Sequence, residues 1–503
     1  MRKIERQLSL LILILLMVVT GCKGPVTEPL KQNTLIVEDI NGINLKELNQ
    51  YDMDIVFIPE KAMIEGHQTI SYRNNEQLAL DKIYFHLYPN VFREEKTAPF
   101  LFDDFNRAYP DGFQPGYIDI YDITLEKQEA FYQIMGEGNS ILEISLPKPL
   151  LPEERVVISM GYTVKLPPAQ ERFGYGENTF NFGNWYPVAA VYDEKGWNLD
   201  PYYPIGDPFY SDVSNYHVKI ETPKDMVVAA SGNIFRDIIQ EESRIWEIEA
   251  KLMRDFAWVV SKDFEVVEKD VEGTVLKMYF IKDKTLKKEI KDWATQAAES
   301  SLIIFNRTFG KYPYGQYSVV QTNFPSGMEY PGIVFIGKQY YDMRWKNYLE
   351  VVIVHETAHQ WWYGIVGNDQ IEEAWLDESL AAYSEVVYYM EKNGADAGQQ
   401  YHTEYNEEEY KLAEGEIKDS VILKPLPSFR GWNDYGPLVY SRGAMFLNEI
   451  YQEYGQETLY GILQEYYQKN RFHNATTKDF QEAAETITGK DMTALFQSWL
   501  LAQ

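Results

Sequence analysis

Residues 351–385 constrain the fold of this chain more than any other stretch. They read VVIVHETAHQWWYGIVGNDQIEEAWLDESLAAYSE, in which an apolar run leads into His355, Glu356 and His359 with the spacing H-E-x-x-H. In a helix, side chains four positions apart lie on one face, so both imidazoles project to the same side. The apolar run can bury the back of that helix. The stretch therefore predicts a buried helix that presents two imidazoles to one point.

Two imidazoles at this spacing are typical of a zinc centre, and Glu356 is placed to accept a proton from a water that the metal activates. A buried pair of histidines without a metal would need hydrogen-bond partners that the Val and Ile neighbours cannot supply. A catalytic zinc site has three protein ligands and one open position, so a further ligand is needed. The nearby acidic candidates are Glu372, Glu373, Asp377, Glu378 and Glu385.

Length and charge restrict the class of protein. A chain of 503 residues exceeds what one compact core usually holds, so we expect two to four domains. The formal net charge of −29 argues against nucleic acid as a partner, because a phosphate backbone would be repelled. Such acidity attracts cationic ligands, and it also serves solubility alone.

The first 22 residues have the features of a targeting segment. A positive start precedes an almost wholly apolar run over residues 8–19, which is too short for a comfortable membrane span. Cys22 is the only cysteine, and VVTGC resembles the lipobox of bacterial lipoproteins. We therefore expect Cys22 to be lipidated and the protein to be an extracytoplasmic, membrane-anchored lipoprotein. A plain secretory signal or an uncleaved anchor are the alternatives.

The remaining chain changes character near residue 265. Residues 23–34 predict a flexible tether, and residues 35–264 predict an all-β domain. The clearest of its short strand patterns are residues 51–58, 67–72, 82–88, 156–162, 216–221 and 256–261. Residues 181–210 are dense in aromatic residues, Pro, Gly and Asn, which fits either an ordered surface loop or a wall of a binding cleft.

Helical patterns dominate the second half. Residues 285–306 have a helical apolar period, two strands follow, and helices prevail from residue 348 onward. Thr476 or Thr477 is the expected N-cap of a late helix, and residues 492–501 form the last one. The acidic residues 404–416 predict a solvated helix face rather than a calcium site, because they lack the ligand spacing of known calcium loops.

The zinc-binding pattern resembles that of a known family, the gluzincin zinc aminopeptidases of the aminopeptidase N and leukotriene hydrolase type. His359 is followed by 18 residues and then Glu378, within a segment WLDESLA that is similar to the family's W-L-N-E-G-F-A. The resemblance implies that Glu378 is the third zinc ligand. Asp377, Ser379 and Leu380 depart from the family pattern.

Two further segments resemble signatures of this family. Residues 326–330, SGMEY, are similar to G-A-M-E-N, which implies that Gly327, Met328 and Glu329 contact substrate and that Glu329 binds its free α-amino group. A carboxylate in a water-poor cleft pairs a protonated amine and rejects a mid-chain amide. Tyr440 lies in YSRG, which is similar to Y-x-K-G and implies a tyrosine that stabilises the oxyanion during hydrolysis.

The resemblance implies an N-terminal β saddle over residues 35–264 followed by a mostly α, thermolysin-like catalytic domain over residues 265–503. It implies one zinc ion per chain, Glu356 as the base, and release of N-terminal residues from peptides with a free amino terminus. The large C-terminal helical domain of many members is expected to be absent. A zinc endopeptidase without an amino-end requirement and a non-catalytic peptide-binding surface lipoprotein are the alternatives.

Overall fold

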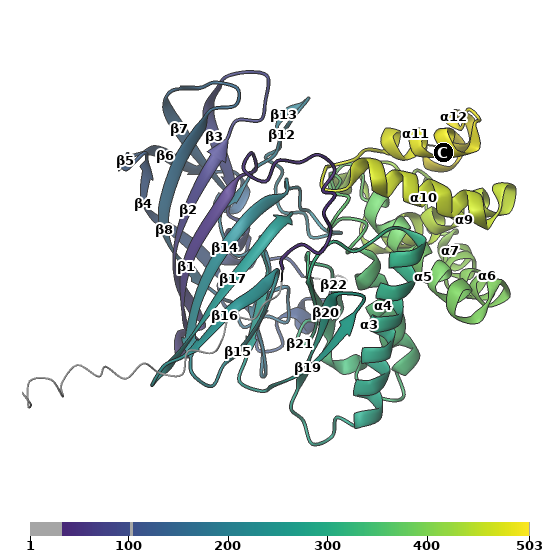
Figure 1. Ribbon diagram of the computed structural model, residues 1–503, viewed down its shortest axis with the longest axis horizontal. Coiled ribbons are helices and arrows are strands. Elements are labelled where there is room, and N and C mark those ends of the chain that lie inside the picture. The colour runs from purple at the N-terminus through teal and green to yellow at the C-terminus, as the bar shows by residue number, and fades with distance from the viewer. Residues whose placement is uncertain (1–32, 101–103, 502–503) are drawn as a thin grey trace, which may run out of the picture.

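The computed structural model describes residues 33–100 and 104–501. The targeting segment, Cys22 and nearly all of the expected tether lie outside the described residues. No helix within residues 33–100 and 104–501 is long and apolar enough to span a bilayer. Strands fill the first half of the described chain and helices fill the second, with a five-stranded sheet between them (Figure 1). The expected order, an all-β region followed by a mostly helical one, is confirmed.

The largest sheet of the β region has eight strands. Its pairing is antiparallel except between β1 and β14, which run parallel. In spatial order the strands are β16 (Asn233–Ile239), β17 (Ser243–Met253), β14 (Ser214–Pro223), β1 (Gln50–Ile58), β2 (Met63–Arg73), β8 (Arg155–Lys165), β4 (Tyr117–Leu125) and β5 (Gln128–Glu129).

Smaller sheets pack beside it. One four-stranded sheet contains β15 (Val227–Ala230), β18 (Trp258–Ser261), β10 (Phe180–Phe182) and β9 (Phe173–Tyr175). The other contains β11 (Val188–Ala189), β3 (Leu80–His86), β7 (Ile141–Leu150) and β6 (Phe131–Met135), and β12 (Tyr192–Asp193) pairs with β13 (Gly196–Trp197). Each of the six predicted strands overlaps an observed one.

Alternating burial explains why these segments form a sheet. Along β1, Tyr51, Met53, Ile55 and Phe57 are buried, whereas the residues between them face outward. This period of two places one apolar face of the strand against the core. Residues 93–117, in which the sequence shows no clear period, contain the short helix α2 (Phe105–Ala108).

A second sheet begins the helical half of the chain. Its strands in spatial order are β19 (Phe264–Val271), β20 (Thr274–Ile281), β21 (Gln316–Thr322), β23 (Ile333–Gly337) and β22 (Gly327–Met328). The three central strands are parallel, and β22 runs antiparallel along one edge. Because β21 and β23 are buried throughout, they read as continuous apolar runs rather than alternating ones. The edge strand β22 carries the SGMEY segment to the site described below.

Helices pack against this sheet and continue to the end of the described chain. They are α3 (Lys288–Thr308), α4 (Lys346–Ala358), α5 (Trp375–Asn393), α6 (Ala395–His402), α7 (Glu408–Ala413), α8 (Trp432–Tyr435), α9 (Gly443–Tyr454), α10 (Gln456–Asn470), α11 (Thr477–Thr488) and α12 (Thr493–Phe496). Thr476 caps α11 through a capping box with Asp479, as the sequence predicts. Three π-helical turns interrupt the series: η6 (Thr403–Glu407), η8 (Gly436–Arg442) and η9 (Gln497–Leu501).

Arg254 joins the β region to the helical region. Its fully buried guanidinium donates to the backbone carbonyls of Ser211 at 2.5 Å, Tyr363 at 2.9 Å and His473 at 3.1 Å. One side chain thereby satisfies carbonyl groups from the residue that follows the aromatic loop 181–210, from the segment after α4 and from the segment after α10. This junction holds the β region against the helices that carry the zinc-binding pattern.

Candidate metal and peptide-binding site

Helix α4 presents the two histidines of the H-E-x-x-H pattern. Its last residue is Ala358, and His359 directly follows as the C-cap, where its N–H still donates to the His355 carbonyl at 3.2 Å. The helical turn therefore extends far enough to keep both imidazoles on one face. Their Nε2 atoms lie 3.0 Å apart.

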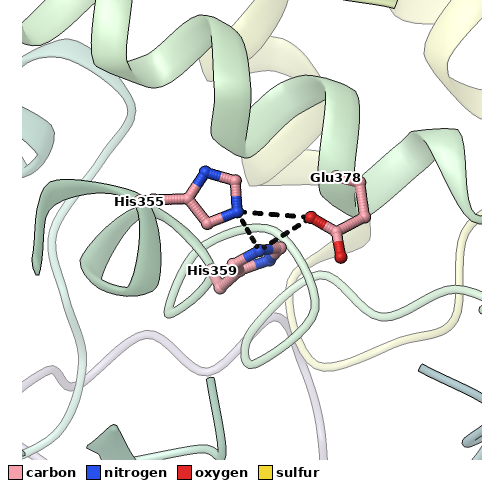
Figure 2. A group of neighbouring side chains, drawn as sticks. All are labelled: His355, His359 and Glu378. Atoms are coloured by element: carbon pink, nitrogen blue, oxygen red, sulfur yellow. Dashed lines mark hydrogen bonds and ion pairs between the residues drawn. The ribbon is translucent and has the colours of Figure 1, made fainter. Parts of the chain in front are cut away.

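Glu378, in the first turn of α5, completes a triangle with these two nitrogens. Its Oε2 atom lies 3.3 Å from Nε2 of His355 and 3.3 Å from Nε2 of His359 (Figure 2). Ligand atoms at about 2.0–2.1 Å from a tetrahedral zinc are about 3.3 Å from one another, so the triangle has the dimensions of three zinc ligands. Two neutral imidazoles and one carboxylate are also a donor set that zinc prefers.

Hydrogen bonds on the far side of each imidazole fix its orientation. Glu385 Oε1 contacts His355 Nδ1 at 2.7 Å, and the Trp362 carbonyl contacts His359 Nδ1 at 3.2 Å. When these oxygens accept the Nδ1 protons, the Nε2 lone pairs face the centre of the triangle. Glu385, one of the candidate ligands, is therefore a partner of a ligand histidine.

The other candidate ligands point elsewhere. Asp377 Oδ2 accepts a hydrogen bond from Gln370 at 2.5 Å. Glu373 Oε2 accepts one from the Thr477 N–H at 2.6 Å, and Glu372 pairs with Lys195 at 3.1 Å. Among the acidic residues of this segment, Glu378 is the one whose carboxylate lies against both Nε2 atoms.

Glu356 lies beside the triangle and is 6% exposed. Burial raises the pKa of its carboxyl to about 8, against the lowering effect of the His355 and His359 imidazoles. Within the described chain no group hydrogen-bonds its Oε2 atom. A Cβ atom on Gly327 would lie 1.9 Å from Glu356 Oε1, so the glycine of β22 leaves the space that this carboxylate occupies.

Glu329 follows β22 and faces the same space. It is 4% exposed, and among the described residues its Oε1 atom has no hydrogen-bond partner. Its carboxylate lies within 4.8 Å of ligand atoms of Glu356 and His359. Side chains alternate along an extended strand, so Gly327 and Glu329 line the cleft whereas Met328 points into the core. The side chain of Met328 is thus not placed to contact a ligand in the cleft, contrary to the expectation from the sequence.

Tyr440 closes the opposite side of the triangle from the π-helical turn η8. Its hydroxyl donates to Glu378 Oε1 at 2.6 Å, and its ring stacks on the His355 imidazole with 5.8 Å between centroids. π-helical turns are rare and often occur at functional sites, where they redirect a side chain. Here the turn directs a phenol hydroxyl toward the metal-binding triangle.

The β region contributes two residues that the sequence analysis did not single out. Asp207, from the aromatic loop 181–210, lies within 4.8 Å of both Glu329 and Glu378, and Arg172 pairs with it at 2.5 Å. Both line the cleft, so one part of that loop is a cleft wall. A possible signal was an acidic residue in an otherwise apolar and aromatic loop, since such a residue needs a partner when it is buried.

These side chains surround a single cleft of about 380 Å³. Glu329, Asp207 and Arg172 lie toward the β region, and residues of α4, α5, α6, η6, α7, α8 and η8 line the remaining wall. Pockets of roughly 300–1,000 Å³ are usual for small-molecule ligands, so the cleft can hold a short peptide segment rather than a folded protein.

Comparison with known proteins found a matching protein family and several related aminopeptidases. The peptidase family M1 domain matches residues 293–499. Aminopeptidase N of Streptomyces lividans is 26% identical over 210 residues, which cover 38% of this chain and 23% of that protein. Aminopeptidase 2, mitochondrial, of Saccharomyces cerevisiae is 25% identical over 310 residues, which cover 59% of this chain and 30% of that protein. The chain thus spans less than a third of the length of these two relatives.

A solved structure shares the fold over nearly the whole chain. A mutant M1 zinc metallopeptidase from Deinococcus radiodurans, bound to a Tyr-Ser-Ala substrate, superposes with a TM-score of 0.62 at 16% identity. The superposition covers 90% of this chain and 93% of that one. At this identity the likeness establishes the common arrangement of a β region and a helical region.

Proposed function

We propose that this chain, whose residues 293–499 match the peptidase family M1 domain, is a zinc aminopeptidase of that family that releases single residues from the amino ends of peptides. The proposal rests on the relation of Glu329 to the metal-binding triangle. The Glu329 carboxylate is buried, has no hydrogen-bond partner among the described residues and lies within 4.8 Å of a ligand nitrogen of His359, so it is suited to pair with a protonated amine.

His355, His359 and Glu378 would hold the zinc ion. When bound, zinc supplies a Lewis acid that polarises the scissile carbonyl and lowers the pKa of water. Glu356 accepts the proton of the attacking water and returns it to the leaving amine. Its burial supports this role, because a carboxylate with a raised pKa both accepts and releases a proton near neutral pH.

Tyr440 stabilises the charge that develops on the carbonyl oxygen as water adds to the carbonyl carbon. Its hydroxyl lies 2.6 Å from a carboxylate oxygen of Glu378, so it already points at the reaction centre. A preorganised donor of this kind acts mainly on the transition state, because the oxygen carries more negative charge there than in the ground state.

Glu329 sets the position of cleavage by binding the α-amine of the first residue. The scissile carbonyl then lies over the metal-binding triangle, and a peptide without a free amine leaves Glu329 buried without a partner. Asp207 adds negative charge next to this position, and Arg172 neutralises part of it. The rival proposal of a zinc endopeptidase has no use for this buried carboxylate.

One experiment separates the alternatives. Purified protein is analysed for zinc and then assayed with a fluorogenic aminoacyl amide and with its N-acetylated counterpart. An aminopeptidase contains about one zinc per chain and hydrolyses the free-amine substrate with strong preference. Internal cleavage of N-acetylated peptides indicates an endopeptidase. Absence of zinc and of any hydrolysis refutes an enzymatic role.

The membrane location is a second part of the proposal. It rests on the VVTGC segment, in which Cys22 is the only cysteine of the chain. Lipidated Cys22 would hold the catalytic region outside the cytoplasm. In a bacterial host, Cys22→Ser should shift the protein from the membrane fraction to the soluble fraction. An unchanged distribution would contradict lipid anchoring at this residue.

A further inference from the structure

The cleft has two chemically different ends. At one end Glu329 lies close to His359 and Glu356, next to Asp207 and Arg172. The other end lies beyond His355, whose Nδ1 contacts Glu385. If Glu329 holds the amine of the first residue, as in the proposed function, the second residue must extend past the triangle toward the His355 side. The side chains at that second end then decide which residue is accepted after the scissile bond.

Aromatic rings form one side of this second end. The Tyr401 ring stacks on the Tyr405 ring, with 4.5 Å between centroids. It also stacks on the Tyr389 ring, with 4.6 Å between centroids. The Tyr401 hydroxyl donates to Glu385 at 2.5 Å, which ties the stack to the partner of His355. Tyr405 remains 47% exposed and lines the cleft, so a face of its π-system is open to a ligand.

Glu409 provides a carboxylate beside these rings. It lines the cleft four residues after Tyr405, and its Oε2 atom accepts a hydrogen bond from Ser441 at 3.4 Å, next to Tyr440. No ion pair to Glu409 forms within residues 33–100 and 104–501. Arg442, which follows Ser441, instead stacks over the Tyr410 and Trp499 rings.

The floor between the rings and the metal-binding triangle is apolar. Val351 and Val352 of α4 and Ala382 of α5 line it, and Tyr348 of α4 stands at the rim, 48% exposed. Long cationic side chains bury their methylene stems along such surfaces and keep the charged head near polar groups. Among the described residues that line the cleft, Arg172 is the single Lys or Arg, and it pairs with Asp207 at the amine end.

We propose that Val351, Val352, Tyr405 and Glu409 form a subsite for the second residue of the peptide and that this subsite selects Lys or Arg. The stem of the cationic side chain packs on the two valines, the head meets the Tyr405 ring, and Glu409 supplies the opposite charge. A neutral side chain of similar length gains only the apolar contact. An acidic side chain is repelled by Glu409 and by the excess of carboxylates in the cleft.

The test compares dipeptides that differ in the second residue alone: Ala-Lys, Ala-Met and Ala-Glu. Wild-type kcat/KM should fall in that order. In Glu409→Gln the Lys-to-Met ratio should fall about five- to tenfold, because a charge-assisted contact becomes a neutral one. In Glu409→Lys the order should reverse, with Ala-Glu above Ala-Lys. Each comparison is a ratio within one variant, so a change in the amount of folded protein does not affect it.

Glu408→Gln is the matched control, because Glu408 is exposed like its neighbour Glu409 but does not line the cleft. Its Lys-to-Met ratio should equal that of wild type. A wild-type profile that is flat across the three dipeptides, or equal effects of the two Gln variants, would overturn the subsite. Ala-p-nitroanilide, which has no second residue, distinguishes the two proposals. Hydrolysis of it with a flat dipeptide profile refutes the subsite alone, whereas no hydrolysis of any substrate refutes the proposed function.

Discussion

Replacing Glu329 by Gln tests the amino-end clamp with almost no change in side-chain shape. The carboxylate is 4% exposed and its Oε1 atom has no partner within the described chain, so a bound ammonium group would gain a charge-assisted hydrogen bond in a water-poor space. Such a bond contributes about 1.5–3 kcal/mol, and its neutral counterpart contributes about 0.5–1.5 kcal/mol. Loss of the ionic attraction adds to the difference. We expect a total loss of about 2–3 kcal/mol, which is about a 30- to 150-fold fall in kcat/KM.

The assay uses two substrates that differ in the amine alone. Ala-p-nitroanilide has the α-amine, and propionyl-p-nitroanilide lacks it. Glu329→Gln should lower kcat/KM for the first by the factor given above and leave the slow hydrolysis of the second nearly unchanged. Zinc content should equal that of wild type, because Glu329 is not one of the three expected ligands. Equal falls on both substrates would refute the clamp and would show that Glu329 acts on the site as a whole.

Four further substitutions probe the rest of the site and the junction between the two regions. Glu356→Gln should abolish turnover and retain zinc, as measured by metal analysis, because only the base is removed. Tyr440→Phe should lower kcat about 10²- to 10³-fold, in a steady-state assay, since one oxyanion donor is lost. Glu385→Gln should weaken zinc affinity about 10- to 100-fold in a chelator competition, because His355 loses its charged partner. Arg254→Met should destabilise the fold by about 3 kcal/mol or more, seen as a lower midpoint in denaturant, because buried carbonyls lose their donor. Turnover by Glu356→Gln would contradict its role as the base, and an unchanged kcat of Tyr440→Phe would contradict its role as an oxyanion donor. An unchanged zinc affinity of Glu385→Gln, or an unchanged unfolding midpoint of Arg254→Met, would contradict the structural role given to that residue.

The location of the site followed from spacing along the chain, because helix geometry is local. A separation of four positions between His355 and His359 suffices to place both imidazoles on one face, whatever the rest of the chain does. Thr476 is likewise a local signal, because an N-cap bonds to N–H groups only a few residues away. The order of an all-β region before a helical one also followed, since the apolar period changes near residue 265.

The family resemblance pointed to Glu378, but the roles of the other acidic residues did not follow from spacing. Glu378 and Glu385 lie about two helical turns apart on α5, yet one faces the Nε2 atoms and the other the Nδ1 atom of His355. Met328 and Glu329 are adjacent, yet the pleat of the strand sends one into the core and the other into the cleft. Such differences depend on how two elements are packed, which a sequence pattern does not contain.

The acidic segment 404–416 illustrates the same limit. Its composition predicted a solvated helix face, and all six of its carboxylates, that of Glu409 included, are exposed. Packing of η6 and α7 against η8 nevertheless turns Tyr405 and Glu409 toward the cleft. A charge run has the same composition whether it faces solvent or a ligand, so only the neighbouring elements distinguish the two.

The sequence by itself determined the zinc-binding pattern, the glutamate beside it and the division into a β region and a helical region, because each depends on periodicity within one element. The tertiary structure alone decided that Asp207 and Arg172, from the β region, stand beside Glu329, and that a stack of tyrosines with Glu409 closes the other end. These residues are far apart along the chain and meet only because the sheets and helices bury their apolar faces against one another.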